Sequence, residues 1–226
     1  NVPSFDMSLA LSGLLGIYLV ICSYAAIGLF MSCLTSYQVV AAVATLGALA
    51  FLNYVGRIGQ EVPFIRDITY WLSISGRSDE LINGLISSED VFYFLIVIGL
   101  FLMLSIMVIL SGKRKLSKSM AFTRYTGVIV LAMLLGYVTS RPGLQCSYDA
   151  SSIKLNSLNP VSQEIMEKME GGLTITTYVN LLEGNFYRGA PSERNSDANR
   201  FKKFIRFKPK IQMNYVYYYA DAGNEV

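Results

Sequence analysis

Residues 7–56 contain no Lys, Arg, Asp or Glu, although the whole chain carries 19 basic and 16 acidic residues. A transmembrane helix needs about 20 consecutive apolar residues. The stretch is therefore long enough to cross a bilayer twice, and we expect helices at residues 9–34 and 39–55. Between them lies a polar elbow made of Thr35, Ser36, Tyr37 and Gln38.

Small residues recur at a spacing of four in both expected helices, at Gly28 and Ser32 and at Ala44 and Ala48. Such pairs let helices approach closely in a bilayer, where lipid supplies no hydrophobic drive for association. Ordinary helix packing explains the pattern, and so does a face that lines a substrate path or a dimer seam. No ionisable residue lies inside either helix, which argues against an ion-coupled transporter.

Two further apolar runs, residues 91–112 and 125–140, flank a basic loop at residues 113–124. Lys and Arg close to membrane spans are retained on the cytoplasmic side, so this loop predicts the orientation of the chain. With the loop in the cytosol, residues 57–90 and 141–226 fall outside the cytoplasm. The fourth run is short for a span, and Arg124 and Arg141 could extend it by reaching toward the two membrane surfaces. The basic residues of the loop are Lys113, Arg114, Lys115, Lys118 and Arg124.

Residues 57–90 form neither a span nor a simple loop. Apolar residues gather on one helical face around Trp71 and on a second around Leu81, with Gly76 as the expected break. Two short amphipathic helices at a membrane surface fit this pattern, with Tyr70 and Trp71 at the depth of the lipid headgroups. The first face contains Phe64, Ile65, Ile68, Trp71 and Leu72, and the second contains Leu81, Ile82, Leu85 and Ile86.

The polar tail at residues 141–226 has the pattern of an α/β domain. Asn159 and Pro160 are typical of a helix start, and the glycines at 171 and 172 of its end. Alternating apolar residues predict strands at residues 173–180 and 211–219, with a helix at residues 197–207 between them. This order favours a parallel βαβ unit, because parallel strands need a long crossover. We also expect a truncated domain, because a sheet of two strands buries little, and this implies a cut at the C-terminal end. Residue 1 is Asn rather than Met, so we expect an internal cut at the N-terminal end as well.

The chain has no His, three Cys and no Cys-x-x-Cys spacing. Without imidazole, Ser-His and Cys-His nucleophile pairs and most zinc sites are excluded. Gly112 and Lys113 are superficially similar to the end of a P-loop, but Met107 stands at its first glycine and Arg114 at its magnesium-binding hydroxyl. We therefore expect no enzyme activity, no cofactor and no metal.

Aromatic and basic residues interleave in the run Arg200-Phe-Lys-Lys-Phe-Ile-Arg-Phe-Lys. An amphipathic helix explains this spacing, and a strip that binds phosphate is the other interpretation. The net charge of +3 is a sum over regions of unlike composition, and it gives no reason to expect a nucleic-acid partner.

Three segments carry a family pattern: Ser32-Cys-Leu-Thr-Ser-Tyr-Gln-Val-Val-Ala-Ala, Asn83-Gly-Leu-Ile-Ser-Ser-Glu-Asp-Val-Phe-Tyr-Phe and Phe101-Leu-Met-Leu. Through them, residues 5–115 resemble the C-terminal half of bacterial ABC transporter permeases of the type-2 exporter class. The resemblance implies a multi-pass inner-membrane protein that pairs with a separate ATP-binding subunit and assembles into a dimeric transporter in the lipid bilayer. It also implies that the elbow at residues 35–38 faces the ATPase. The first three helices of the family are absent from this sequence, so the chain would be half of a permease.

The tail carries a second pattern in Tyr148-Asp149, Lys154-Leu-Asn-Ser-Leu-Asn-Pro-Val-Ser-Gln-Glu-Ile and Leu173-Thr-Ile-Thr-Thr-Tyr-Val-Asn. These segments resemble the opening of the auxiliary domain of gliding-motility-associated ABC transporters. The two resemblances together imply a permease half at residues 1–112 fused, through a fourth span at 125–140, to the start of a periplasmic domain at 141–226. The alternative is a membrane-anchored extracytoplasmic binding or scaffold protein without transport activity.

The predicted topology can be tested with single cysteines in a background that lacks Cys22, Cys33 and Cys146. Ser192→Cys should react with a membrane-impermeant thiol reagent in intact cells, because residue 192 is expected outside the cytoplasm. Ser117→Cys should react only after the cells are permeabilised. Labelling of Ser117→Cys in intact cells would refute the orientation.

Overall fold

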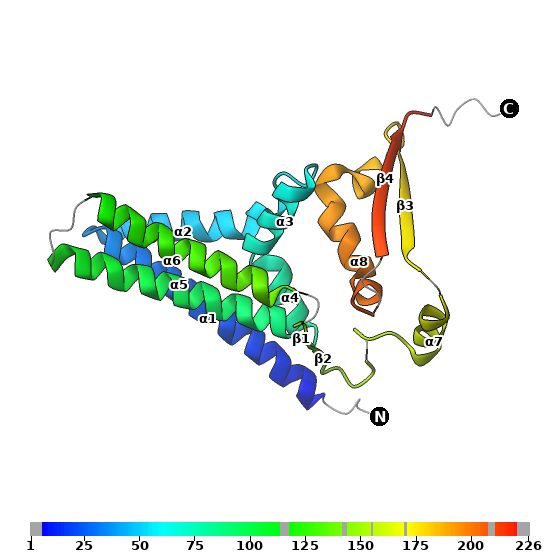
Figure 1. Ribbon diagram of the computed structural model, residues 1–226, viewed down its shortest axis with the longest axis horizontal. Coiled ribbons are helices and arrows are strands. Elements are labelled where there is room, and N and C mark those ends of the chain that lie inside the picture. The colour runs from blue at the N-terminus through cyan, green and yellow to red at the C-terminus, as the bar shows by residue number, and fades with distance from the viewer. Residues whose placement is uncertain are drawn as a thin grey trace. The chain divides into compact units, whose positions relative to one another are not determined.

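The computed structural model describes residues 6–113, 118–141, 144–154, 156–169, 171–207 and 211–220. Its contacts divide the chain into two compact units (Figure 1). Unit 1 comprises residues 1–53 and 74–153, and unit 2 comprises residues 54–73 and 154–226.

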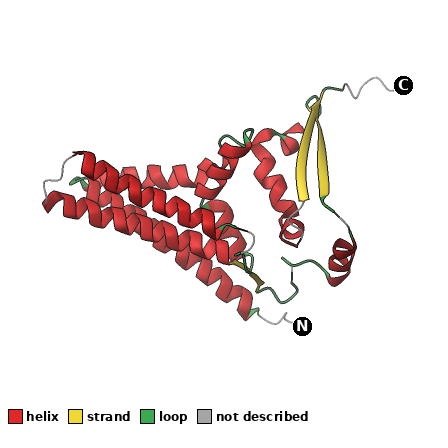
Figure 2. Ribbon diagram, viewed as in Figure 1, coloured by secondary structure: helices red, strands yellow, loops and turns green. Residues whose placement is uncertain are grey.

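Unit 1 is built mainly from helices, and among its described residues a short antiparallel pair of strands lies beside them (Figure 2). Every expected span is a helix long and apolar enough to cross a membrane. Asp6 caps the first of them by accepting a hydrogen bond from the backbone N–H of Leu9 at 3.1 Å. The four helices are α1 (Met7–Leu34), α2 (Gln38–Tyr54), α5 (Ser88–Lys113) and α6 (Lys118–Thr139).

The fourth helix is longer than the sequence predicts. α6 has 22 residues and already begins at Lys118, so the expected loop at residues 113–124 is largely wrong: Lys113 ends α5, and Lys118 and Arg124 are helical. Arg114 and Lys115 lie outside the described residues. Because α6 is longer than predicted, Arg124 is not needed to extend a short span. The Arg141 guanidinium lies over the ring of Tyr137, 4.2 Å from its centroid.

The helices of unit 1 pack in a row, with α1 along α5 and α5 along α6. The buried face of α1 is narrow because small residues dominate it: Ser12, Gly16, Leu19, Ser23, Ala26 and Ile27. Gly28 faces α2, since a Cβ built on it would lie 3.6 Å from a methyl of Thr45. Asn53 of α2 also donates a hydrogen bond to the hydroxyl of Tyr24 at 3.0 Å. Gly28 is therefore in ordinary van der Waals contact with α2.

Two short helices follow α2, as the sequence predicts, but their break lies elsewhere. A 3₁₀ turn η1 (Val55–Arg57) leads to α3 (Pro63–Leu72), and α4 (Ser75–Ile82) follows. The break is at Ser73, whose extended backbone with ψ 130° ends α3, whereas Gly76 lies inside α4. The interruption comes from backbone geometry at a serine rather than from the glycine.

The prediction that Leu85 and Ile86 are helical is wrong. They belong to strand β1 (Leu85–Ser87), which pairs antiparallel with β2 (Ser147–Asp149). Gly84 ends the helix with φ +89°, a conformation that residues with a Cβ rarely adopt, and an added Cβ would lie 2.7 Å from Leu9. The positive φ of Gly84 therefore ends the helix, and the apolar residues that follow it form a strand.

A buried ion cluster fastens α4 to α5. One guanidinium nitrogen of Arg77 lies 3.0 Å from Asp90 Oδ1 and 3.1 Å from Glu89 Oε1. Arg77 is 3% exposed and Asp90 2% exposed, and the guanidinium also stacks over the ring of Tyr93, 4.6 Å from its centroid. Burying one of these charges alone would be costly, so the pair is stable only because each offsets the other.

Glu89 extends this cluster to α6. Its Oε1 accepts a hydrogen bond from the hydroxyl of Ser140 at 3.2 Å, and its Oε2 accepts one from the side-chain amide of Gln145 at 2.8 Å. Ser140 follows the last residue of α6, and Gln145 precedes β2. A single carboxylate therefore connects α4, the first turn of α5 and the chain leaving α6.

Unit 2 contains the parallel pair of strands that the sequence predicts. β3 (Leu173–Asn180) and β4 (Ile211–Tyr218) pair from Leu173 opposite Ile211 to Asn180 opposite Tyr218. The crossover consists of two 3₁₀ turns, η2 (Phe186–Gly189) and η3 (Pro191–Glu193), and helix α8 (Arg194–Phe207), which begins three residues before the predicted helix. Helix α7 (Pro160–Lys168) precedes β3 and is capped by Asn159, as expected. The described β4 residues alternate between a half-buried and an exposed face.

Replacing Arg77 with Met should strongly destabilise unit 1, because it leaves Asp90 buried without its cation. We expect the free energy of unfolding to fall by about 3–5 kcal/mol, and the double variant Arg77→Met with Asp90→Leu to recover much of the loss. Thermal unfolding of the full chain in detergent, followed by circular dichroism, measures both. Arg57→Met is the matched control, since Arg57 is exposed. Equal melting temperatures for Arg77→Met and the unaltered chain would contradict the role given to the ion cluster.

Candidate functional site

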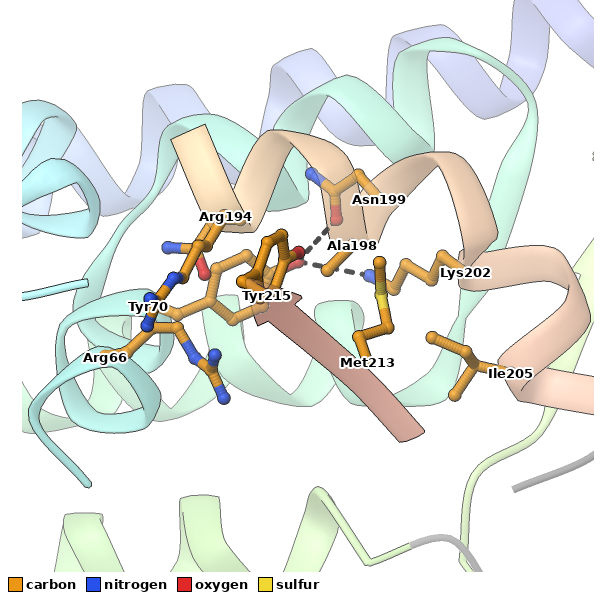
Figure 3. Close-up of a pocket in the computed structure, with 10 residues that line it drawn as sticks. Arg66, Tyr70, Arg194, Ala198, Asn199, Lys202, Ile205, Met213 and Tyr215 are labelled. Carbon is orange, nitrogen blue, oxygen red and sulfur yellow. Dashed lines mark hydrogen bonds between the residues drawn. The ribbon is translucent and has the colours of Figure 1, made fainter. Parts of the chain in front are cut away.

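Unit 2 contains a cavity of about 330 Å³ formed by α3, α8 and β4 (Figure 3). This volume lies at the lower end of the range of small-molecule sites. We call it the α3–α8 pocket. Its lining residues are Arg66, Tyr70, Arg194, Asn195, Ala198, Asn199, Lys202, Ile205, Met213 and Tyr215.

Secondary structure explains why these residues meet. The six α8 residues fall on one helical face, because they are separated by three, four or one positions along the helix. Arg66 and Tyr70 are one turn apart on α3, and Met213 and Tyr215 alternate on the same face of β4. Each element therefore contributes one face to the pocket.

The first turn of α8 is held by the segment that precedes α3. Arg194 Nη1 donates to the backbone carbonyls of Gln60, at 3.4 Å, and Glu61, at 3.2 Å. Asn195 donates from its backbone N–H to Gln60 Oε1 at 3.0 Å and from its side-chain amide to the carbonyl of Gly56 at 2.8 Å. These hydrogen bonds fix the α8 wall of the pocket against residues 56–61.

Arg194 is surrounded by neutral groups. Its Nη2 donates to the hydroxyl of Tyr217 at 3.3 Å, and its guanidinium lies 5.0 Å from the ring centroid of Tyr215 and 5.9 Å from that of Tyr217. Its Nε is buried, and the part of the chain that the structure describes offers it no hydrogen-bond acceptor. Arg194 is therefore half-buried, and it has no hydrogen-bonded carboxylate among the described residues.

The opposite wall is organised by Tyr70 of α3. In Figure 3 its hydroxyl lies between two α8 side chains. It donates to Asn199 Oδ1 at 3.3 Å and accepts from Lys202 Nζ, also at 3.3 Å. The Lys202 ammonium is 5.8 Å from the centroid of the Tyr70 ring, so it is also favoured by the ring's electron-rich face.

Tyr215 binds a carboxylate of α8. Its hydroxyl donates to Asp197 Oδ2 at 3.1 Å, and the other oxygen of Asp197 lies 3.8 Å from Arg200. Burial raises the pKa of Tyr215 to about 12, and the negative charge of Asp197 acts in the same direction, whereas Arg194 and Arg66 oppose it. Tyr215 therefore remains a neutral hydrogen-bond donor at physiological pH.

The predicted ATPase-facing residues lie at one end of unit 1. Thr35 ends α1, Gln38 begins α2, and Ser36 and Tyr37 connect them. The backbone N–H of Tyr37 donates to Thr35 Oγ1 at 3.2 Å, and the Tyr37 side chain is 74% exposed. In Figure 1 this elbow lies at the same end of unit 1 as the last turn of α5 and the first turn of α6.

The sequence did not single out the pocket. Tyr70 and Trp71 were expected at lipid headgroup depth, and the structure places Tyr70 in the pocket lining. Within the aromatic and basic run that starts at Arg200, an amphipathic helix is the structure observed, and Lys202 and Ile205 line the pocket. Arg66 and Arg194 carried no sequence signal, because their proximity depends on the tertiary packing of segments far apart in the chain.

Among the described residues, no group of three or more Cys, Asp or Glu side chains is arranged to hold a metal ion. No protein-family model matches the chain, and no curated protein or solved structure is similar to it.

Removing the Tyr215 hydroxyl should weaken the fold in a pH-dependent way. Tyr215→Phe takes a donor from the buried Asp197 carboxylate, so the free energy of unfolding at pH 8 should fall by about 1–3 kcal/mol. Above pH 10 the unfolded chain loses the tyrosine proton while the folded chain keeps it until about 12. Stability contributed by the neutral phenol is therefore present below pH 10 and lost as the pH rises to 12.

Denaturant unfolding of both proteins between pH 8 and pH 12 measures this effect. The stability advantage of the unaltered chain over Tyr215→Phe should shrink across the upper part of that range. Tyr219→Phe is the control, since that side chain is 74% exposed, and its substitution should change stability by less than about 0.5 kcal/mol. A constant advantage at all pH values would contradict the assignment.

Proposed function

We propose that this chain is a membrane-spanning subunit of an ATP-driven ABC transporter, an exporter of the gliding-motility-associated type in the bacterial inner membrane. The order of elements in unit 1 carries this inference. Two membrane-length helices are joined by an exposed elbow, a short helix and strand follow, and two more long helices complete the unit. The first three long helices and the elbow between the first two agree with the arrangement that the resemblance to type-2 exporter permeases implies, and the fourth long helix is the span expected to lead to the tail.

The partner in this function is a separate ATP-binding subunit that docks at the elbow. Thr35 and Gln38 lie at the adjoining ends of α1 and α2, so a force applied there acts on both helices at once. Two chains form the dimeric transporter, and residues 141–226 lie in the periplasm. The chain itself binds no nucleotide and performs no catalysis.

The far end of α1 supplies a route for coupling. Ser12 donates to the carbonyl of Leu81 at 2.7 Å, and Gly16 lets α4 approach so closely that an added Cβ would lie 2.9 Å from Leu81 Cβ. Movement of α1 therefore displaces α4, and the Arg77 ion cluster transmits that displacement to α5. A rigid helix with a partner at each end is a suitable lever between nucleotide hydrolysis and the opposite membrane face.

A second function is favoured by the α3–α8 pocket. A cavity with cationic and aromatic walls suits a membrane-anchored binding protein, in which the four helices serve only as an anchor. The two functions differ in whether an ATPase accompanies the chain.

Purification of the tagged chain from its native membranes decides between them. ATPase activity should copurify with the chain, and the chain produced alone should show none above a mock preparation. Tyr37→Asp places a charge at the docking elbow and should reduce the copurifying activity about tenfold or more. Tyr148→Asp is the matched control, because Tyr148 is a similarly exposed tyrosine of unit 1, at 60%. ATPase activity from the chain alone would refute the transporter assignment, and its absence from native preparations would favour the binding protein.

A further inference from the structure

The α3–α8 pocket combines cationic side chains with an absence of described acidic lining. Arg66, Arg194 and Lys202 contribute positive charges, and none of the described residues that line the cavity is Asp or Glu. The described partners of Arg194 are carbonyl oxygens, a phenol hydroxyl and aromatic faces, all of them neutral. Hydrogen bonds to neutral acceptors leave the guanidinium without a counter-charge, and an anion in the cavity would supply one.

The position of the pocket on α8 adds to its positive potential. Arg194 and Asn195 occupy the first turn of the helix, where the helix dipole favours an anion. The one acidic side chain of α8, Asp197, accepts a hydrogen bond from Tyr215 and lies 3.8 Å from Arg200. Asp197 does not line the cavity.

The two ends of the pocket differ in polarity. In Figure 3, Arg66, Arg194 and Tyr70 gather toward one end, and Ile205 and Met213 lie toward the other. Lys202 comes from the same side as Ile205, and its ammonium points toward Tyr70. Arg194 and Ile205 are eleven positions apart on α8, which corresponds to about 16 Å of helix. The cavity therefore suits an elongated ligand with an anionic head and a short apolar part.

We propose that the α3–α8 pocket binds a phosphate-bearing amphipathic ligand, with the phosphate between Arg66, Arg194 and Lys202 and the apolar part against Ile205 and Met213. Planar guanidinium groups bind phosphate oxygens in pairs, and Lys adds a point charge. Tyr70 and Asn199 hold the Lys202 ammonium in position through the hydrogen bonds at the Tyr70 hydroxyl. This binding does not depend on whether the chain takes part in transport.

Two sources can supply such a ligand. One is a soluble organic phosphate, and the other is the headgroup of an anionic phospholipid, since α3 follows the membrane-length helix α2 in the chain after a short connection. Both present the same phosphate oxygens with an apolar group attached. The two sources are distinguished by whether a soluble phosphate binds to the chain in a zwitterionic membrane that contains no anionic lipid.

The test uses the full chain in nanodiscs of phosphatidylcholine. Butyl phosphate is titrated while the fluorescence of Trp71, the single tryptophan, is followed, and calorimetry provides a second readout. We expect saturable binding that is tighter than that of inorganic phosphate, because the butyl group covers Ile205 and Met213. In a parallel arm, the chain is purified from an equimolar mixture of phosphatidylcholine and phosphatidylglycerol, and native mass spectrometry counts the lipids retained. Selective retention of phosphatidylglycerol identifies the headgroup as the source.

Variants of α8 test whether the ligand binds in the pocket. Lys202→Gln should weaken binding about tenfold or more, because it removes a charge-assisted hydrogen bond, and Lys202→Arg should largely preserve it. Lys203→Gln removes the same charge from the next residue, which is exposed and does not line the pocket, and it should have little effect. The inference is overturned if neither butyl phosphate nor phosphatidylglycerol binds selectively, or if Lys203→Gln weakens binding as much as Lys202→Gln.

Discussion

The ion cluster of Arg77 with Asp90 and Glu89 is the interaction on which the arrangement of unit 1 depends. It lies where the short helix α4 meets the first turn of α5, and Glu89 carries it on to Ser140 and Gln145 beyond α6. Lipid gives apolar helices no reason to choose one neighbour over another, so helix association needs small-residue contacts or polar links. Here α1 supplies the small residues and the ion cluster supplies the polar link. Because a lone buried charge is so unfavourable, the cluster also discriminates against packings in which α4 lies elsewhere.

Patterns that extend over many residues predicted most of the fold. The charge-free and apolar runs located all four long helices, and alternation predicted parallel strands at residues 173–180 and 211–219, of which the second is observed at residues 211–218. What failed were features decided by single backbone conformations or by distant partners. Gly76 was expected to break a helix and lies inside α4, whereas Gly84, with φ +89°, ends the helical pattern and sends Leu85 into a strand. A glycine in sequence does not reveal which conformation it adopts, since the surrounding packing decides.

The sequence could not have predicted the α3–α8 pocket for a different reason. Its walls come from residues 66–70, 194–205 and 213–215, and no local period relates these segments. Composition even obscured the site, because the basic residues of α8 are explained equally well by a solvent-exposed helix face. Only the tertiary packing separates Lys202, which lies against Tyr70, from Lys203, which is exposed. The elbow at residues 35–38 was predictable because it is a local feature between two long helices.

The two units partner their arginines in opposite ways, and this contrast favours a ligand in unit 2. In unit 1 the buried guanidinium of Arg77 meets two carboxylates within 3.1 Å. In unit 2 Arg194 is half-buried and its described hydrogen-bond partners are neutral, while the Asp197 carboxylate meets Tyr215 and Arg200. A hydrogen bond to a neutral acceptor leaves a guanidinium without a counter-charge. An anion from outside the chain would complete for Arg194 the pairing that unit 1 achieves internally for Arg77.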